Sequence, residues 1–311
     1  MRMLRSSLGP LAFVLVCVAS QSATGQKLLH WKLHGGEKLA LEMKQQIGME
    51  LTMFGAPVKV STDMLMEIDW NVTHVADDGV MTVEQTIRRI TMAMTAPGME
   101  PVEFDSDTAD KAEGAAKELA KGITPLLAGA FTQRMRPTGE VVDVQLTEQA
   151  ARAFEASPAA GQLKSIFTKD GLKNLTGQVA AELPSEPVSK GDTWNRKLDI
   201  KLPQGQFKAD VQYTYAGTER QGGVTAEKID VEMTLDFGEG MNLEIGQGGP
   251  MQAKVQAKSQ DNTGVMYFDA DAGRLLSTKM TQDMTLQTKV GDTVIDQKVR
   301  STMEMTLRPA K

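Results

Sequence analysis

The sequence predicts an α+β protein that is mostly antiparallel β, built on a coiled antiparallel sheet or half-barrel with a helical insertion. Two observations support this fold class. Both ends of the chain alternate between apolar and polar residues, whereas the middle is rich in Ala, Lys and Glu. Alternation with a period of two gives a strand one apolar face and one wet face. We therefore expect one broad sheet whose apolar face is turned inward.

The clearest strand pattern runs from residue 39 to residue 53. Seven of its eight odd positions are apolar, and no even position carries a large apolar side chain. The alternation resumes at residues 64–73. Further along, Met81 and Val83 share one parity while Ile90 shares the other with Met92, which predicts a β-bulge between the two pairs.

The two ends of the chain repeat some of the same residues. Gly36 and Met43 recur as Gly273 and Met280, at a fixed offset of 237 residues. Alternating strands also share such patterns by chance, so duplication and coincidence both stay open. Either way, we expect the hairpins at the two ends to join one sheet.

The middle of the chain has helical composition. Residues 108–130 have apolar side chains spaced for one helical face, with Asp107 or Thr108 as the expected cap. A hairpin turning at residues 137–139 follows, and helices are expected again before residue 182. The predicted organisation is a signal peptide at 1–25, N-terminal strands at 26–107, a helical insertion at 108–181 and C-terminal strands at 182–311, with 26–311 forming one composite domain.

The first residues have the composition of a signal peptide. Arg2 and Arg5 precede an apolar run at residues 8–18, which is too short to span a bilayer comfortably. Small residues then favour cleavage before Gln26, with a site after Ala19 as the alternative. The sequence therefore predicts export to the periplasm or the extracellular space.

The cysteine content narrows the chemistry. Cys17 is the single cysteine and lies inside the predicted signal peptide, so the mature chain would have neither thiol nor disulfide. Lipidation of Cys17 is an alternative, although Val16 stands where such sites have a small residue. A chain without thiols excludes thiol nucleophiles, zinc–thiolate sites and iron–sulfur clusters.

Charge and hydropathy exclude two further classes of partner. The chain has 34 basic and 40 acidic residues, a net charge of −6, and no basic run of five. Binding to nucleic acid needs clustered Lys and Arg, so none is expected. No later run of 18 apolar residues occurs, so no transmembrane segment is expected in the mature chain.

The sequence shows no catalytic or cofactor motif, and we predict a non-enzymatic protein without a cofactor or metal. His30 and His34 would lie about 13 Å apart on a strand, too far to share one metal ion. The acids at residues 269–271 fit a hairpin turn better than a calcium loop, because the closing Glu is missing. No Gly-x-Ser-x-Gly or phosphate-binding glycine motif is present.

Methionine is the unusual feature of the composition, with 20 residues. Three interpretations compete: ordinary core filling, a soft apolar cavity for a lipid-like ligand, and a Cu(I) site formed by Met-x-Met pairs. The candidate ligand-binding residues are those of apolar parity in the terminal strands: Met43, Met49, Met64, Met66, Met280, Met284, Met303 and Met305.

The predicted function is that of an exported envelope protein that binds an apolar small molecule or lipid in a Met-lined concavity. One alternative is a structural or protein-interaction module with a filled core and an unknown protein partner. A second alternative, from another class, is a hydrolase of envelope glycans, whose paired carboxylates only a tertiary structure can locate.

Two motifs give a resemblance. The chain opens with Leu-x-Trp-x-x-x-x-Gly-Glu at residues 29–37 and later has Pro-Val-x-x-Gly-Asp-Thr-Trp at residues 187–194. Together with the Met- and Thr-rich strands, these resemble an uncharacterised family of secreted, β-rich bacterial proteins of planctomycete type. The resemblance implies export and a β-rich fold, but no activity. In architecture alone, the chain is also similar to curved-sheet lipoprotein carriers, and architecture does not fix function.

Overall fold

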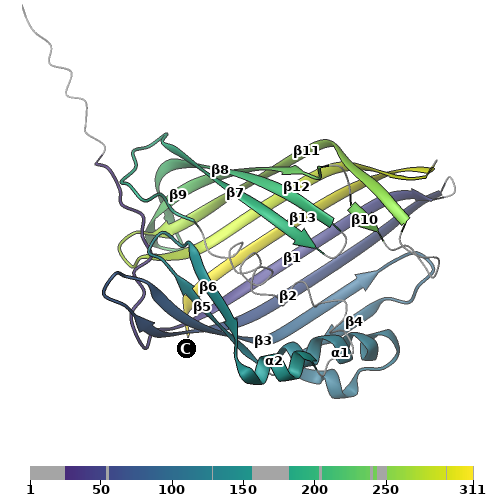
Figure 1. Ribbon diagram of the computed structural model, residues 1–311, viewed down its shortest axis with the longest axis horizontal. Helices are drawn as coiled ribbons and strands as arrows, with labels where there is room; N and C mark the ends of the chain where they lie inside the picture. The colour runs from purple at the N-terminus through teal and green to yellow at the C-terminus, as the bar shows by residue number, and fades with distance from the viewer. Residues whose placement is uncertain are drawn as a thin grey trace, which may run out of the picture.

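The computed structural model describes residues 25–53, 56–127, 129–155, 182–202, 205–238, 241–243, 251–291 and 293–310. The predicted signal peptide, apart from Gly25, lies outside these residues, as does most of the predicted helical stretch before residue 182. The described strands form one antiparallel sheet that does not close (Figure 1). The mostly antiparallel β class is thus confirmed.

The strands and helices follow one another along the chain as predicted in outline. The first six strands are β1 (Lys38–Met53), β2 (Ala56–Val75), β3 (Met81–Thr95), β4 (Val102–Asp105), β5 (Ala130–Met135) and β6 (Val141–Leu146). The others are β7 (Thr193–Leu202), β8 (Gly205–Gln221), β9 (Val224–Asp236), β10 (Met241–Leu243), β11 (Met251–Asp269), β12 (Arg274–Val290) and β13 (Thr293–Pro309). The helices are η1 (Ser106–Lys111), α1 (Gly114–Leu127) and α2 (Glu148–Glu155).

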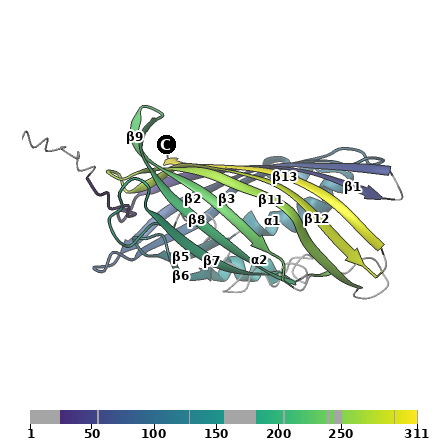
Figure 2. The ribbon, with the colours of Figure 1, turned by 90° about the horizontal axis from the view of Figure 1, so that it is seen from above.

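The sheet has the order β6-β5-β3-β2-β1-β13-β12-β11-β9-β8-β7, with β4 paired to β3 and β10 to β11. The first and last long strands, β1 and β13, therefore lie side by side at its centre, with Met43 opposite Met305. This confirms the expectation that the two terminal hairpins join one sheet. Figure 2 shows that the sheet coils, so that β5, β6 and β7 lie in a layer facing β1 and β13.

The expected β-bulge lies in β3. Glu67 pairs with Arg89 but the next residue, Ile68, pairs with Ile87, so Arg88 is the extra residue. The bulge lets apolar side chains of both parities in β3 face the inside of the coiled sheet. It also leaves Arg88 on the outer face, where its guanidinium contacts Glu67 at 2.6 Å.

The helical segment begins differently from the prediction. The chain enters a 3-10 helix, η1, at Ser106, and the capping residue is Asp105 rather than Asp107 or Thr108. The Asp105 carboxylate accepts the backbone N–H of Asp107 at 3.0 Å and is held by Arg89 of β3. The cap is thus placed by a contact between strands, which local composition does not reveal.

The hairpin within the segment 108–181 is confirmed, as β5 and β6 turning at residues 136–140. Its strands extend the sheet, because β5 pairs with the first half of β3. Of the described helices, α1 contacts β3 and β4, whereas α2 contacts the hairpin strands β5 and β6. Both described helices lie along one side of the sheet in Figure 1.

One end of the coiled sheet is filled by the N-terminal segment 25–36, which we call the strap. Its backbone bonds to three loops: Lys27 forms a bridge with Val188, Trp31 donates to Pro137, and Lys32 donates to the carbonyl of Gly273, which has a φ of +62°. The strap contributes the buried side chains Leu29, Trp31 and Leu33.

The Trp31 indole lies at the centre of this filled end. Its ring centroid lies 6.2 Å from that of Trp70 and 5.8 Å, edge to face, from that of Phe268. Trp31, Trp70 and Phe268 are 2% exposed or less. Residues from the strap, β2 and β11 therefore share one close-packed core.

Candidate ligand cavity

A partly open cavity of about 320 Å³ lies beyond the filled end, between the two layers of the coiled sheet. The back wall comes from β1, β11, β12 and β13, and the front wall from β7, β8 and β9. The lining residues are Gln45, Arg196, Leu198, Phe207, Ala209, Val211, Tyr213, Val231, Met233, Leu235, Met266, Thr278, Met280, Gln282, Ser301, Met303 and Met305. This volume is at the lower end of the range of about 300–1,000 Å³ that is typical of ligand pockets.

Strand register explains why methionines gather on the back wall. Met280 of β12 lies opposite Met303 of β13, and Met303 lies opposite Gln45 of β1. Because directly opposed residues share one face of a sheet, these side chains form a row across the strands. The row continues outside the cavity at Met64 of β2, opposite Gln45.

Gly264 of β11 provides space for this row. It lies opposite Met280, and a Cβ atom at this position would collide with the Met280 sulfur and stand 2.6 Å from the Lys279 carbonyl oxygen. A side chain here would therefore displace the Met280 thioether, which lines the cavity.

Amide side chains close the wall between β9 and β11. The backbone pairing of these strands ends at Glu232 and Thr263. Beyond that point, the Gln260 side chain accepts the backbone N–H of Leu235 at 2.8 Å and donates to the carbonyl of the same residue at 3.0 Å. The Asn262 amide donates to the Met233 carbonyl at 3.1 Å. β9, which carries Met233 and Leu235, is thus joined to β11 by side chains here.

The charged group of the cavity wall is neutralised. The Arg196 guanidinium lies 2.6 Å from the Glu182 carboxylate, and the Arg196 side chain is 15% exposed. Trp194 stacks on Tyr213 with ring centroids 5.5 Å apart and donates its indole N–H to the Glu182 carbonyl. Burial raises the pKa of the Tyr213 phenol, against the opposing effect of Arg196.

The other polar side chains of the lining are uncharged: Gln45, Thr278, Gln282 and Ser301. Thr278 is 5% exposed. Among the described residues its hydroxyl oxygen has no hydrogen-bond partner, although it is buried. Leaving a buried hydroxyl unpaired costs about 1–3 kcal/mol, so this group favours a partner inside the cavity.

The structure brings three of the eight candidate methionines to the cavity: Met280, Met303 and Met305. Three of the others, Met43, Met64 and Met66, are half-buried on the same inner face of β1 and β2. The remaining two, Met49 and Met284, lie further along the same face, where both are opposite Val299 of β13.

Sequence reasoning missed the front wall of the cavity. Alternation in β8 and β9 predicted strands there, but no local signal shows that they fold over β12 and β13. The missed lining residues of the front wall are Arg196, Leu198, Phe207, Ala209, Val211, Tyr213, Val231, Met233 and Leu235. Those of the back wall are Gln45, Met266, Thr278, Gln282 and Ser301.

The predicted turn at residues 269–273 is confirmed. The Asp269 carboxylate accepts the backbone N–H groups of Asp271 and Ala272 at 3.0 and 2.8 Å, as in an ordinary Asx turn. Within the described ranges, no group of three His, Cys, Asp or Glu side chains could hold a metal ion. No helix in those ranges is long and apolar enough to cross a membrane.

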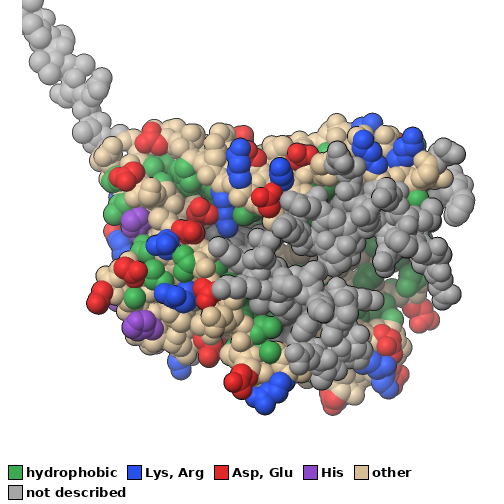
Figure 3. All heavy atoms as spheres, viewed as in Figure 1, with side chains coloured by type: hydrophobic (Ala, Val, Ile, Leu, Met, Phe, Trp, Pro, Cys, Tyr) green, Lys and Arg blue, Asp and Glu red, His purple; other side chains and the backbone are tan. Residues whose placement is uncertain are grey.

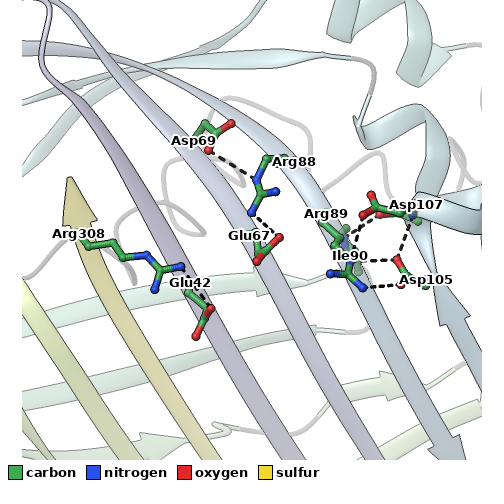
Figure 4. Close-up of polar contacts among 10 residues, drawn as sticks. Glu42, Glu67, Asp69, Arg88, Arg89, Ile90, Asp105, Asp107 and Arg308 are labelled. Carbon is green, nitrogen blue, oxygen red and sulfur yellow. Dashed lines mark hydrogen bonds and ion pairs between the residues drawn. The ribbon is translucent and has the colours of Figure 1, made fainter. Parts of the chain in front are cut away.

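The outer face of the sheet carries paired charges. Figure 4 shows Arg88 with Glu67 and Asp69, and Arg89 with Asp105 and Asp107, all on or beside β2 and β3. On the face seen in Figure 3, basic and acidic side chains are interspersed. These pairs are typical of a solvated sheet surface and contribute little each.

Comparison with known proteins identifies the family. A family described as "Family of unknown function (DUF6263)" matches residues 78–298. Because this is more than half of the chain, the chain belongs to that family. A comparison with curated proteins gives no match. Membership therefore provides no activity.

Among solved structures, a lipovitellin chain studied for lipid–protein interactions is 13% identical, with a TM-score of 0.47. The match covers 90% of this chain but only 26%, about a quarter, of the lipovitellin chain. A protein from Bacteroides fragilis, described as exported with a YmcC-like fold, is 10% identical with a TM-score of 0.29 and coverages of 91% and 99%. A domain from Vibrio parahaemolyticus, described as belonging to an outer membrane lipoprotein-sorting protein, is 12% identical with a TM-score of 0.20 and coverages of 89% and 87%.

Proposed function

We propose that the protein is an exported, non-enzymatic envelope protein that holds an apolar or lipid-like ligand in the cavity between β7–β9 and β11–β13. The observation that carries the proposal is a 320 Å³ cavity lined mainly by aliphatic, aromatic and thioether side chains. Removal of apolar surface from water drives such binding at roughly 25 cal/mol per Å².

The methionines suit this role because of their shape and softness. Met280, Met303 and Met305 line one wall, and unbranched thioethers adapt to irregular apolar surfaces. Across the cavity, Leu198 and Phe207 provide a second apolar wall. An acyl or similar chain could therefore contact apolar groups on both sides. The composition of residues 1–25 supports export to the envelope as part of the same proposal.

A hydrolytic function receives less support from the carboxylates. Among the described residues, Glu227 is the buried acidic side chain, at 3% exposed. It lies near the filled end, where Tyr215 and Thr218 donate hydrogen bonds to one oxygen and Lys27 lies 3.2 Å from the other. Three such partners hold the carboxylate in a structural role.

Native mass spectrometry of protein isolated from its own envelope tests the proposal. We expect an adduct of defined mass that is lost in Ala209→Phe, because a phenyl ring at this buried lining position would occupy the cavity. Lys208→Phe, on the outer face of the same strand, is the matched control and should keep the adduct. Overpacking costs about 1–3 kcal/mol, so thermal unfolding must show that both variants fold. Absence of any adduct from the folded wild-type protein would contradict the proposal.

A further inference from the structure

The polar groups of the cavity indicate the class of ligand, an inference that rests on the proposed function. We propose that the ligand is a neutral, single-chain amphiphile whose hydroxyl group binds Thr278 and whose chain lies along Met280 and Met303. The inference stands on three features: the cavity volume, the state of its charges and the unpaired hydroxyl of Thr278.

The volume of the cavity suits a ligand with one short chain. A cavity of 320 Å³ holds about ten groups of the size of a water molecule, each taking about 30 Å³. A methylene group is of similar size, so a chain of about ten to twelve heavy atoms fits.

The charges of the cavity lining favour a ligand with an uncharged head group. Arg196, the basic residue of the lining, is already paired with Glu182 at 2.6 Å. The remaining polar lining groups are amides and hydroxyls, which carry no charge to balance an anion. A carboxylate head would be buried with no free counter-charge, which is costly.

The Thr278 hydroxyl supplies a specific contact. It is buried and has no partner among the described residues, and a hydroxyl can both donate and accept. A ligand hydroxyl can therefore either donate a hydrogen bond to it or accept one from it. Thr278 lies between Met266 of β11 and Met305 of β13 in its row, so the head group would stay within an apolar surround.

The geometry of β12 directs the apolar chain of the ligand away from the filled end. Met280 follows Thr278 by two residues on β12, so the two side chains share one face about 6.6 Å apart. Met303 lies opposite Met280 and extends this surface onto β13. A chain whose head is at Thr278 would therefore extend over both thioethers, facing Leu198 and Phe207 of the front wall.

Three probes of equal chain length test the inference on the delipidated full chain: 1-decanol, sodium decanoate and decane. Calorimetry gives the dissociation constants of the first two, and the thermal unfolding midpoint in decane-saturated buffer reports the third. We expect 1-decanol to bind about tenfold or more tightly than decanoate at pH 7, a difference of about 1.4 kcal/mol. All three probes should raise the unfolding midpoint.

Thr278→Val removes the hydroxyl and keeps the shape of the side chain. It should weaken 1-decanol binding about tenfold and leave the effect of decane unchanged. Thr281→Val, on the exposed face of the same strand, is the matched control and should change neither. Should Thr278→Val fail to fold, the comparison of 1-decanol with decanoate on the wild-type chain still decides.

The possible failures are distinguishable. Decanoate binding as tightly as 1-decanol, or an unchanged 1-decanol affinity in folded Thr278→Val, would overturn the neutral head group while the apolar cavity remains supported by decane. If none of the three probes shifts the unfolding midpoint, the inference and the proposed function both fail.

Discussion

The same strands give two different results at the two ends of the sheet. On β1, Leu39 and Leu41 are 2% exposed or less, whereas Met43, Met49 and Leu51 on the same face are only half-buried. On β2 and β13 the same change occurs along the strand. Alternation therefore determines which face turns inward, but a separate element decides whether that face is filled.

The strap is that element. Segment 25–36 inserts Leu29, Trp31 and Leu33 between the layers at one end only. Beyond the strap, the layers are separated by the cavity that begins at Met305 and Met280. The filled end thus provides stability, and we expect the cavity to provide binding.

The largest expected difference between the two regions concerns core truncation. Trp31→Ala should lower the free energy of unfolding by about 3–5 kcal/mol, because it removes the centre of the filled end. Met303→Ala, at the half-buried cavity wall, should cost clearly less. Urea unfolding measures both variants. Equal losses would mean that the two regions are packed alike.

An intermediate effect is expected at Gly264, on the cavity wall. Gly264→Ala should cost about 1–3 kcal/mol, because the new Cβ meets the Met280 sulfur and the Lys279 carbonyl. Gly48→Ala is the matched control in the same sheet, since its Cβ would meet only the Arg300 carbonyl at an ordinary 4.0 Å. Thermal unfolding compares the two variants, and similar midpoints would show that Met280 does not occupy the space above Gly264.

The smallest effect is expected on the outer face, at Asp105. Hydrogen bonding from Arg89, followed by that from the Asp107 backbone N–H, lowers the pKa of Asp105. A lowered folded-state pKa stabilises the protein above the unfolded pKa of about 3.9, and this contribution is lost as the pH falls through the folded value.

Asp105→Asn should therefore cost about 1 kcal/mol or less at pH 7, after allowance for screening of a pair that is about one-third exposed. The difference from wild type should shrink as the pH falls below 3.9. Urea unfolding as a function of pH measures this change, with Glu103→Gln, at an exposed position of β4, as the control. A difference that stays constant down to acid pH would argue for a role of Asp105 in packing alone.

Local sequence was sufficient for much of the fold. The parity of residues 39–53 predicted the inner face of β1. The parity change between Val83 and Ile90 predicted a bulge, which the structure places at Arg88. These features depend on neighbours within one strand or hairpin, where a period of two is a direct signal.

Features that depend on distant partners could not be predicted. The cap is Asp105 because Arg89 of another strand holds it there. The front wall depends on how far the sheet coils, and no local pattern encodes that. Likewise, the eight candidate methionines share one face, but only the fold-over of β7–β9 separates Met280, Met303 and Met305 from the rest.

The central claim is that the space beside Met280 and Met303 holds a ligand. A crystal structure of the protein isolated from its own envelope tests it most directly. We predict continuous, elongated electron density that begins at the Thr278 hydroxyl and passes both thioethers. The contrary result would be a space filled by the protein's own side chains, with the layers in direct contact.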